Sequence, residues 1–457
     1  MGLLFWLLFS LMELAYDAWT IVKQREKELW LRNRLILRGA QVIVFLLLML
    51  LPGNKLDMRF TMFFGLLLVQ TLIAFVGFLV GRKKAEGNRK VGITVAKAVG
   101  TIALYLMMLA PAFIFTGYEG LPVSGSYEVA QTQAILVDPD RVETFETDGS
   151  CREVPVHFYY PKNVNGQEKF PLVIFSHGAF GYYQSNTSSY MELASNGYVV
   201  ISLDHPYHSF FTKDTSGKLI TVNPQFINEV YYINEDETPE EEIFELSSKW
   251  LELRTQDICF VLDEVKKAAD IQALNENWFY EGKEEAGEEL QKAVSMADGE
   301  RIGLFGHSLG GAASVNVGRI RDDIDAVIDL DGTMMGEETG YENGAYQFQD
   351  EPYPVALLSV DNEKHHIDGK SLGSYYVNNV VIDQALDGRN TYIKGSAHFT
   401  FTDLPLFAPA LAKNLEMGTT STIDDERGIR IVNEIVLMFF NHYLKNEGEV
   451  TLLPCYE

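Results

Sequence analysis

The sequence has few cysteines. Only three occur in 457 residues, namely Cys151, Cys259 and Cys455. So small and odd a number excludes a disulfide framework and leaves at least one free thiol. Cys259 lies in an apolar helical pattern, so we expect a small core residue, and no nearby histidine suggests a cysteine nucleophile. Disulfide-rich folds and cysteine hydrolases are therefore not predicted.

Basic residues are also scarce over most of the chain. The formal net charge is −26, which argues against a nucleic-acid-binding protein with a general basic surface. Residues 1–117 carry 14 basic and 6 acidic residues, whereas the rest of the chain carries 23 basic and 57 acidic ones. Apolar residues make up 47% of the chain, enough for a globular core. Two parts of opposite charge are therefore predicted.

Charged residues are almost absent from three segments of the first part. The segments are 40–53, 60–80 and 99–117. A membrane-spanning helix needs about 20 mostly apolar residues. The second and third segments meet this length nearly or fully, and the first does so if it begins near Leu35 and keeps Arg38 close to one end. We therefore predict an all-α transmembrane region over residues 1–117 with three or four helices.

The opening segment, residues 2–22, is less clear because it contains Glu13 and Asp17. Each charge near the bilayer centre costs about 2.5–3.5 kcal/mol on insertion scales. The segment either spans the membrane or lies in its interface as an amphipathic helix. It lacks a basic start and a small-residue cleavage site, so a signal peptide is not predicted.

The basic residues between these segments predict the topology. Residues 23–38 hold six basic side chains and residues 82–90 hold five, whereas residues 53–59 hold only Lys55 and Arg59. The positive-inside rule places the two richer loops in the cytoplasm. The chain after about residue 118 is then expected on the extracytoplasmic side of the cell membrane.

Beyond the membrane region, strand and helix patterns alternate. We expect a linker and lead-in over 118–150 and one α/β domain over 151–457. Strand patterns occupy 154–160, 170–176, 198–204, 301–306, 324–331, 353–360 and 390–395, and helical patterns occupy 188–197, 247–268 and 426–444. This alternation predicts a mainly parallel sheet with helices on both faces. The acidic stretch 231–246, within a segment near 214–246, is predicted to be a solvated insertion, with a cation site or a lid as alternatives.

Ser308 stands in a G-x-S-x-G pattern, "GHSLG". A strand pattern precedes it and a helical pattern follows, which is the setting in which this motif raises a serine on a sharp turn. Gly306, Gly310 and Gly311 remove the Cβ atoms that would crowd such a turn, and His307 completes it. The sequence therefore predicts a serine nucleophile on an α/β-hydrolase fold.

A serine nucleophile needs a base, and the base needs an orienting acid. His398 follows a strand pattern in the small-residue loop "KGSAHFTF" and is the favoured base. The adjacent pair His365 and His366 is flanked by charged residues and is expected in an exposed loop.

Three carboxylates compete for the role of the acid: Asp329, Asp331 and Asp361. Asp331 and Asp361 each end a predicted strand, where sites form in open α/β sheets. Spacing alone leaves the choice open.

The loop "FSHGAFG" over 175–181 is expected to supply part of an oxyanion hole. In this fold one backbone donor follows the nucleophile and the other comes from such a loop. We therefore predict the amides of Leu309 and Ala179 as the donors, with His177 organising the turn. His205 and His208 in "HPYH" have no evident third ligand, so no metal is expected.

Several motifs together resemble one family. "PLVIFSHGAFG", "YVVISLDHPYHSFF", "RTQDICFVLDEV", "RIGLFGHSLGGAAS", "VIDLDG" and "IKGSAHFTF" look like the plasma, or type II, platelet-activating-factor acetylhydrolases, in order over about 150–405. The resemblance implies Asp331 as the acid, His398 as the base, and Ala179 and Leu309 as the backbone donors. It also implies hydrolysis of short or oxidised acyl groups at sn-2 of phospholipids, without calcium. The multi-span N-terminus and the acidic stretch depart from the family pattern.

We therefore expect a membrane-integral serine ester hydrolase that needs no cofactor, acts on a small-molecule or lipid ester and does not bind nucleic acid. One alternative is a broad short-chain carboxylesterase without a phospholipid role. The other is a catalytically inactive hydrolase-fold receptor or scaffold.

Overall fold

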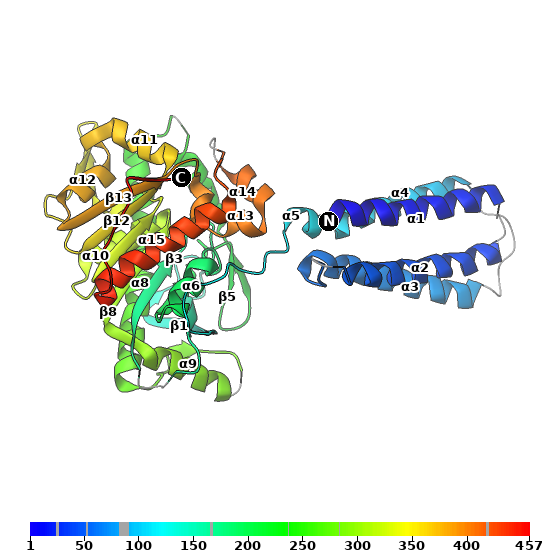
Figure 1. The fold of residues 1–457 in the computed structure, drawn as a ribbon, viewed down its shortest axis with the longest axis horizontal. Coiled ribbons are helices and arrows are strands. Elements are labelled where there is room, and N and C mark those ends of the chain that lie inside the picture. Colours follow the sequence, from blue (N-terminus) through cyan, green and yellow to red (C-terminus); the bar gives the residue numbers. More distant parts are fainter. Residues whose placement is uncertain are drawn as a thin grey trace. The chain divides into compact units, whose positions relative to one another are not determined.

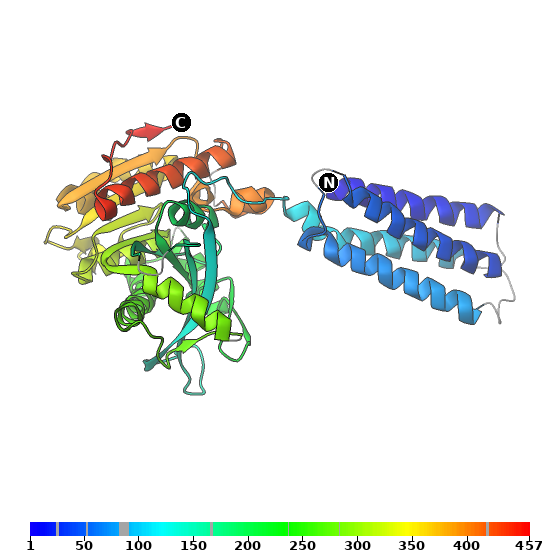
Figure 2. The same ribbon diagram turned by 60° about the horizontal axis from the view of Figure 1, so that its bottom comes forward.

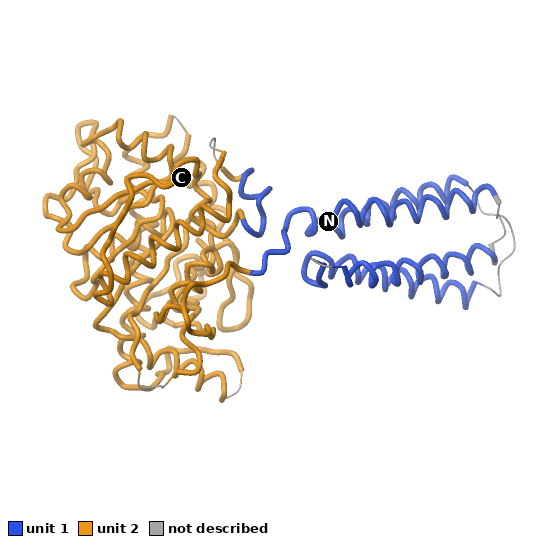
Figure 3. The backbone as a smooth tube through the Cα atoms, viewed as in Figure 1, with its two compact units in different colours: residues 1–119, 406–414 blue, residues 120–405, 415–457 orange. Residues whose placement is uncertain are grey.

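The computed structural model describes residues 1–23, 27–51, 54–81, 91–164, 168–235, 237–282, 284–416 and 420–457. The chain forms two compact units, shown in Figure 3. Unit 1 comprises residues 1–119 and 406–414, and unit 2 comprises residues 120–405 and 415–457. The basic segment 82–90 and Arg25, which contribute to the predicted topology, lie outside the described residues.

Unit 1 is helical, as Figures 1 and 2 show. Its helices are α1 (Gly2–Lys23), α2 (Lys27–Met49), α3 (Met58–Gly81), α4 (Val91–Met108) and α5 (Ala110–Ile114). Among the described residues, three helices are long and apolar enough to cross a membrane: Gly2–Val22, Met58–Gly81 and Val91–Met108. The helix α2 is not among them, and its first half carries Arg32, Arg34 and Arg38.

Two predicted segment boundaries were wrong. The helix predicted over 99–117 begins at Val91 and ends at Met108, and the chain restarts as the short α5. Pro111 stands at the start of α5, where a residue without an N–H group is tolerated. The segment predicted over 40–53 is the second half of α2, which begins at Lys27.

The interior of unit 1 is partly polar, although much of its surface is apolar. Glu13 and Arg38 are buried, and Arg38 Nη2 donates to Glu13 Oε1 at 2.9 Å. Arg38 Nη1 also donates to Gln41 Oε1 and to the Tyr105 hydroxyl, both at 2.6 Å. Long apolar side chains such as Leu72 face outward instead. A charge inside a membrane bundle is tolerated when it is paired in this way.

Unit 2 is built on a ten-stranded sheet in the order β14-β13-β12-β9-β8-β3-β4-β2-β1-β7. The strands from β4 to β14 in this order run parallel, whereas β2, β1 and β7 are joined by antiparallel pairings. Their bounds are β1 (Val129–Val142), β2 (Cys151–Pro161), β3 (Phe170–Ser176), β4 (Val199–Leu203), β7 (Trp278–Phe279), β8 (Ala297–His307), β9 (Ala326–Leu330), β12 (Ala356–Asn362), β13 (Asp387–Ile393) and β14 (Cys455–Tyr456). Two separate hairpins are β5 (Phe211–Lys213) with β6 (Leu219–Thr221), and β10 (Glu338–Glu342) with β11 (Ala345–Phe348).

Helices cover both faces of the sheet. The helices of unit 2 are α6 (Thr187–Ser195), α7 (Pro224–Ile233), α8 (Glu240–Ile271), α9 (Glu284–Met296), α10 (Leu309–Ile320), α11 (Glu363–Leu372), α12 (Val377–Gln384) and α15 (Asp425–Lys445), with 3-10 turns η1 (Met335–Glu337), η2 (Gly373–Tyr375) and η3 (His398–Phe401). The short helix α13 (Leu404–Phe407) runs into the segment 406–414 of unit 1, which also holds most of α14 (Pro409–Leu415). In Figure 1, α6 and α15 cross the near face of the sheet. This arrangement is the predicted α/β-hydrolase fold, which the structure confirms.

The strand sequences explain why both faces are covered. Along β3, Leu172 and Ile174 join one core cluster, while Val173 and Phe175 join the other. Successive residues of a strand point to opposite faces, so an uninterrupted apolar strand must be buried on both sides. The first cluster packs against α8, α9 and α10, and the second against α6 and α15.

One expectation differs from the structure. The lead-in over 118–150 is not a linker throughout, because residues 129–142 form β1 and pair with β2 from Val129↔Pro161 onward. The acidic stretch 231–246, predicted to be a solvated insertion, contains the end of α7 and the start of α8, and its described residues are exposed or half-buried. Glu240, Glu241 and Glu242 form the first turn of α8, where carboxylates complement the helix dipole.

Candidate active site

The predicted site residues lie at one edge of the sheet. Ser308 follows β8, Asp331 follows β9, His398 begins η3 after β13, and Ala179 lies three residues beyond β3. These strands are parallel, so their carboxyl ends meet at the same edge. The fold therefore brings together segments that are up to 219 positions apart in the sequence.

Ser308 has the backbone geometry of a sharp strand-to-helix turn. Its φ is 55° and its ψ is −126°, a conformation that few residues other than glycine adopt. The Ser308 amide donates to Leu330 O at 2.9 Å, which ties the turn to the end of β9. The helix α10 begins at the next residue.

The glycines around Ser308 are required by close backbone contacts. A Cβ on Gly306 would lie 2.3 Å from the carbonyl of Gly310, and one on Gly310 would lie 2.0 Å from Ser176 O. A Cβ on Gly311 would lie 1.9 Å from Asp329 Oδ1. These distances are far below van der Waals contact, so no side chain fits at any of the three positions.

Asp331 and His398 form a hydrogen bond. His398 Nδ1 donates to Asp331 Oδ2 at 2.6 Å, and Asp331 is buried whereas 38% of the His398 side chain is exposed. His307 connects this pair to the serine turn, because its Nε2 lies 3.0 Å from His398 O. Among the described residues, no hydrogen bond engages His398 Nε2. This nitrogen is thus left open for a proton transfer.

Asp331 is a fully engaged carboxylate. Besides His398, it accepts hydrogen bonds from the Asn362 backbone N–H at 2.8 Å and from Asn362 Nδ2 at 2.7 Å. Burial alone would raise the pKa of Asp331, but hydrogen bonds from His365 and His398 hold it well below its usual range. Asp331 also has a positive φ of 55°, as Ser308 does.

The other two aspartates are placed differently. Asp329 is fully buried, and burial and the charge of Asp361 raise its pKa well above the usual range. Asp361 accepts a hydrogen bond from Ser359 Oγ at 2.9 Å and lies 3.7 Å from His366 Nδ1. Of the three candidates, Asp331 is the one in contact with His398.

The prediction of an exposed loop around His365 and His366 was wrong. Both lie on α11, and His365 Nδ1 contacts Asp331 Oδ1 at 3.0 Å while its Nε2 contacts the Tyr376 hydroxyl. Burial lowers the pKa of His365, but the hydrogen bond and the charge of Asp331 outweigh it and raise the pKa to about 9. His365 is therefore a cation at neutral pH, with both ring nitrogens occupied.

Asp331, Asp361 and His365 also meet the distance condition for holding a metal ion, because one ligand atom of each lies within 4.8 Å of the others. Both Asp331 oxygens already accept hydrogen bonds, from Asn362, His365 and His398. A metal would have to displace these donors, so we interpret the group as a hydrogen-bonded cluster.

The loop after β3 lies against Ser308. A Cβ on Gly178 would lie 3.2 Å from Ser308 Cβ. Leu309 is buried in a cluster that also contains Ala179 and Phe180. Among the described residues, no hydrogen bond engages the amide N–H of Ala179 or of Leu309. Two free backbone donors therefore flank the serine.

An apolar wall packs against the side chains of Ala179 and Leu309. It consists of Phe226 on α7 and Trp250 on α8, with Val230, Ile233 and Leu246 packed around them. The stretch 231–246 thus contributes apolar as well as acidic residues.

Comparison with known proteins agrees with this geometry. The family model described as platelet-activating factor acetylhydrolase, isoform II, matches residues 144–451. The chain belongs to this family. Proteins named platelet-activating factor acetylhydrolase from Cavia porcellus and Gallus gallus are 24% and 25% identical to it, over 61% of this chain and 58% and 63% of their own length.

A third relative of this acetylhydrolase-family chain is a probable 1-alkyl-2-acetylglycerophosphocholine esterase from Arthroderma benhamiae, 24% identical over 61% of this chain and 62% of its own. The chain thus spans about three fifths of the length of these relatives. A ferulic acid esterase structure from Streptomyces cinnamoneus matches with a TM-score of 0.48 and 18% identity, covering 72% of this chain and 93% of its own.

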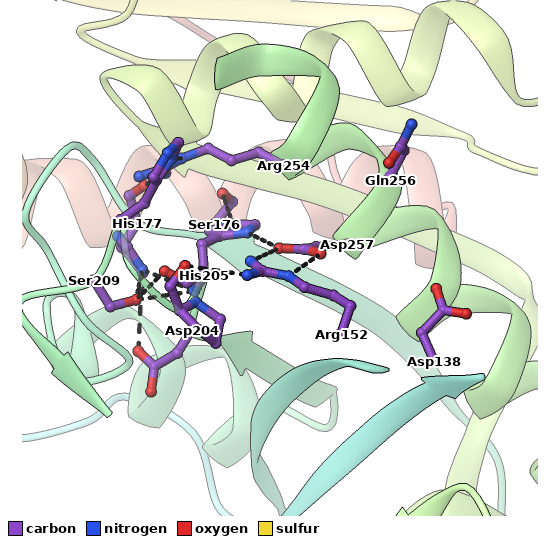
Figure 4. Close-up of polar contacts among 12 residues, drawn as sticks. Asp138, Arg152, Ser176, His177, Asp204, His205, Ser209, Arg254, Gln256 and Asp257 are labelled. Carbon is purple, nitrogen blue, oxygen red and sulfur yellow. Dashed lines mark hydrogen bonds and ion pairs between the residues drawn. The ribbon is translucent and has the colours of Figure 1, made fainter. Parts of the chain in front are cut away.

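This member of the acetylhydrolase family holds a second serine–histidine–aspartate group, which the sequence analysis missed (Figure 4). Ser176 Oγ lies 2.9 Å from His205 Nε2, and His205 Nδ1 lies 2.9 Å from Asp257 Oδ2. All three side chains are fully buried. Burial and the charge of Arg254 lower the pKa of His205 to about 4, so this imidazole is neutral. The one sequence signal for it was the unexplained "HPYH" motif.

Proposed function

We propose that this protein is a membrane-anchored serine ester hydrolase whose catalytic residues are Ser308, His398 and Asp331. The observation that carries the proposal is the 2.6 Å hydrogen bond between Asp331 and His398 beside a serine held in a strained turn. The membership in the acetylhydrolase family supports the same assignment.

In the proposed mechanism, Ser308 Oγ attacks the ester carbonyl carbon while His398 Nε2 accepts the hydroxyl proton. Asp331 keeps the imidazole in the tautomer with a proton on Nδ1 and stabilises the imidazolium that forms. The amides of Ala179 and Leu309 donate to the oxyanion. The leaving alcohol takes the proton from His398, and water then hydrolyses the acyl-enzyme by the same steps.

We propose short or oxidised acyl esters of phospholipids as the substrates. The relatives from Cavia porcellus and Gallus gallus are named as acetylhydrolases of platelet-activating factor, and the relative from Arthroderma benhamiae is named as a probable esterase of a 1-alkyl-2-acetylglycerophosphocholine. The three helices apolar enough to span a membrane would tether unit 2 next to lipid. The apolar wall of Phe226 and Trp250 beside Leu309 offers a surface for an acyl chain.

The second candidate is a short-chain carboxylesterase without a phospholipid role. The observation that favours it is the departure of this chain from the family pattern at the acidic stretch 231–246, which forms part of the wall over Leu309. The two candidates differ in headgroup dependence, which one assay can measure.

The test uses the full-length protein in detergent with p-nitrophenyl esters from acetate to decanoate, followed by sn-2 acetyl phosphatidylcholine. We expect hydrolysis of the short esters and of the phospholipid, both absent in Ser308→Ala. A fluorophosphonate probe should label the wild type and not this variant. Hydrolysis of the p-nitrophenyl esters alone would favour the carboxylesterase. Absence of both hydrolysis and labelling would favour an inactive receptor.

We further propose that unit 2 lies on the extracytoplasmic side of the cell membrane. The uneven distribution of basic residues between 23–38, 53–59 and 82–90 supports this orientation. Protease added to intact cells should degrade unit 2 without prior lysis. Protection until the cells are lysed would place it in the cytoplasm instead.

A further inference from the structure

Arg254 is a buried cation that forms no salt bridge among the described residues, although the charge of Asp257, one helical turn away, favours it. It lies on α8, its side chain is fully buried, and among the described residues no carboxylate lies within 4.0 Å of its guanidinium nitrogens. The neighbouring Asp257 pairs with Arg152 Nη2 at 2.7 Å and with Arg141 Nη2 at 2.8 Å instead. Burying an unpaired charge is costly, so this position calls for a specific reason.

The guanidinium binds the oxyanion loop. Arg254 Nη1 donates to His177 O, and Nη2 donates to Gly178 O at 3.3 Å. Its Nε lies 3.4 Å from His208 Nδ1, and that imidazole stacks on Phe226 with ring centroids 3.8 Å apart. Figure 4 shows the Arg254 side chain extending from its helix to His177. The planar fork of an arginine suits two neighbouring carbonyl groups, which a lysine ammonium cannot bridge in the same way.

The two carbonyl groups matter because of peptide geometry. Gly178 C=O and Ala179 N–H are the two ends of one planar peptide unit, and in a trans peptide they point in opposite directions. His177 Nδ1 also donates to Gly178 O, at 2.7 Å. Fixing the carbonyl therefore fixes the direction of the Ala179 N–H. A donor on the carbonyl also polarises the peptide, which makes its N–H a stronger donor.

The positive charge next to the loop 177–179 is that of Arg254 and not that of a neighbouring histidine. Burial and the charge of Arg254 hold the pKa of His177 well below its usual range, so this imidazole is neutral. Burial lowers the pKa of Arg254 to about 9, which still leaves the guanidinium protonated at neutral pH. One fixed positive charge thus lies behind the loop that flanks Ser308.

We propose that Arg254 is a positioning residue for the oxyanion hole, which it builds by clamping the carbonyl groups of His177 and Gly178 so that the Ala179 N–H faces the reacting ester. The inference rests on the proposed function. Removal of one oxyanion donor typically lowers kcat by about 10²–10³-fold. Loss of the clamp misdirects one donor without deleting it, so a somewhat smaller loss follows.

The test compares Arg254→Lys and Arg254→Met with the wild type, in the full-length protein and with p-nitrophenyl acetate. Rates are normalised to the sites that a fluorophosphonate titrates, so that unfolded protein does not count. We expect kcat to fall about 10–100-fold in Arg254→Lys and further in Arg254→Met, with KM within about threefold. The matched control is Arg141→Lys, which alters a partner of Asp257 but does not contact the loop; its kcat should stay within twofold.

A second readout separates positioning from general damage. A trifluoromethyl ketone forms a tetrahedral adduct with the nucleophile and places an oxyanion in the hole. Its inhibition constant should rise in Arg254→Lys by the same factor by which kcat/KM falls. A kcat per titrated site within twofold of the wild type, or a loss confined to KM, would overturn the inference. An inactive wild-type protein would refute the proposed function itself, which is a distinguishable result. If Arg254→Met does not fold, Arg254→Lys decides alone.

Discussion

Unit 2 contains two serine–histidine–aspartate groups that consist of the same three residue types but differ in exposure, backbone geometry and hydrogen bonding. In one, Ser308 stands on a strained turn and His398 is 38% exposed with its Nε2 open. In the other, Ser176 ends a strand, and His205 has both nitrogens engaged by Ser176 and Asp257. The second group has no exposed atom from which to reach a substrate, because all three side chains are fully buried.

The difference indicates why we propose the Ser308 group, and not the buried group, as the acyl-transfer site. The histidine–aspartate distances are similar in the two groups, at 2.6 Å and 2.9 Å, so they do not distinguish them. Among the described residues, the serine–histidine hydrogen bond occurs only in the buried group. Exposure, backbone strain and free amide donors do distinguish them. The buried group links the end of β3, the residues after β4 and α8, and Ser176 directly precedes the loop 177–179. We therefore expect it to contribute to stability rather than to react.

The largest difference in activity is expected when each of the two serines is replaced by alanine. Ser308→Ala should lower the rate of p-nitrophenyl acetate hydrolysis by about 10⁴-fold or more, because the nucleophile is lost. Ser176→Ala should leave kcat within about threefold, as this hydroxyl only donates to His205. Equal losses in both variants would contradict the distinction between the groups.

Substitution of Asp331 should lower activity, whereas substitution of Asp257 should lower stability. Asp331→Asn should lower kcat by about 10³–10⁴-fold, because the amide no longer holds the His398 tautomer. Asp257→Asn leaves the buried Arg152 with a weaker partner and should lower the free energy of unfolding by about 3–5 kcal/mol. Both variants should be measured by stopped-flow kinetics and by urea unfolding. Similar losses of kcat in the two variants, or similar losses of unfolding free energy, would contradict this separation.

A smaller effect is expected for substitution of His365, the second histidine in contact with Asp331. The pKa of His365 is raised from 6.5 to about 9, so its contribution to stability is fully present below pH 6.5 and is lost as the pH rises through 9. The full contribution is about 1–3 kcal/mol. His365→Gln should therefore flatten the decline in melting temperature between pH 6.5 and 9. An unchanged slope in this variant would show that His365 is neutral in the folded protein.

The smallest effect concerns the support of the buried group itself. Ser176→Ala should lower the melting temperature by about 2–4 °C, since it leaves the buried His205 Nε2 without its donor. The measurement is differential scanning fluorimetry at pH 7, with Ser216→Ala on an exposed loop as the matched control. A shift in Ser176→Ala no larger than that of the control would show that the hydroxyl of Ser176 does not contribute to stability.

The sequence was sufficient for the parts of this molecule that local patterns determine. The strand 170–176 has the predicted bounds, and the strands before Ser308 and Asp331 lie where the patterns placed them. The burial of Glu13 against Arg38 was not predictable, because the partners come from different helices and a hydropathy pattern does not show which helices pack together. The position of His365 was missed for a related reason: its charged neighbours favoured a loop, whereas one face of α11 is buried against Asp331.

The position of Arg254 has a consequence for anyone who alters the acyl specificity of this protein. Trp250, which helps to wall the region beside Leu309, lies one helical turn before Arg254 on the same rigid helix. A smaller residue in place of Trp250 would let that turn relax and would shift the proposed clamp on Gly178. Variants selected for longer acyl chains would then lose turnover, and compensating substitutions would accumulate around the loop 177–179 rather than around position 250.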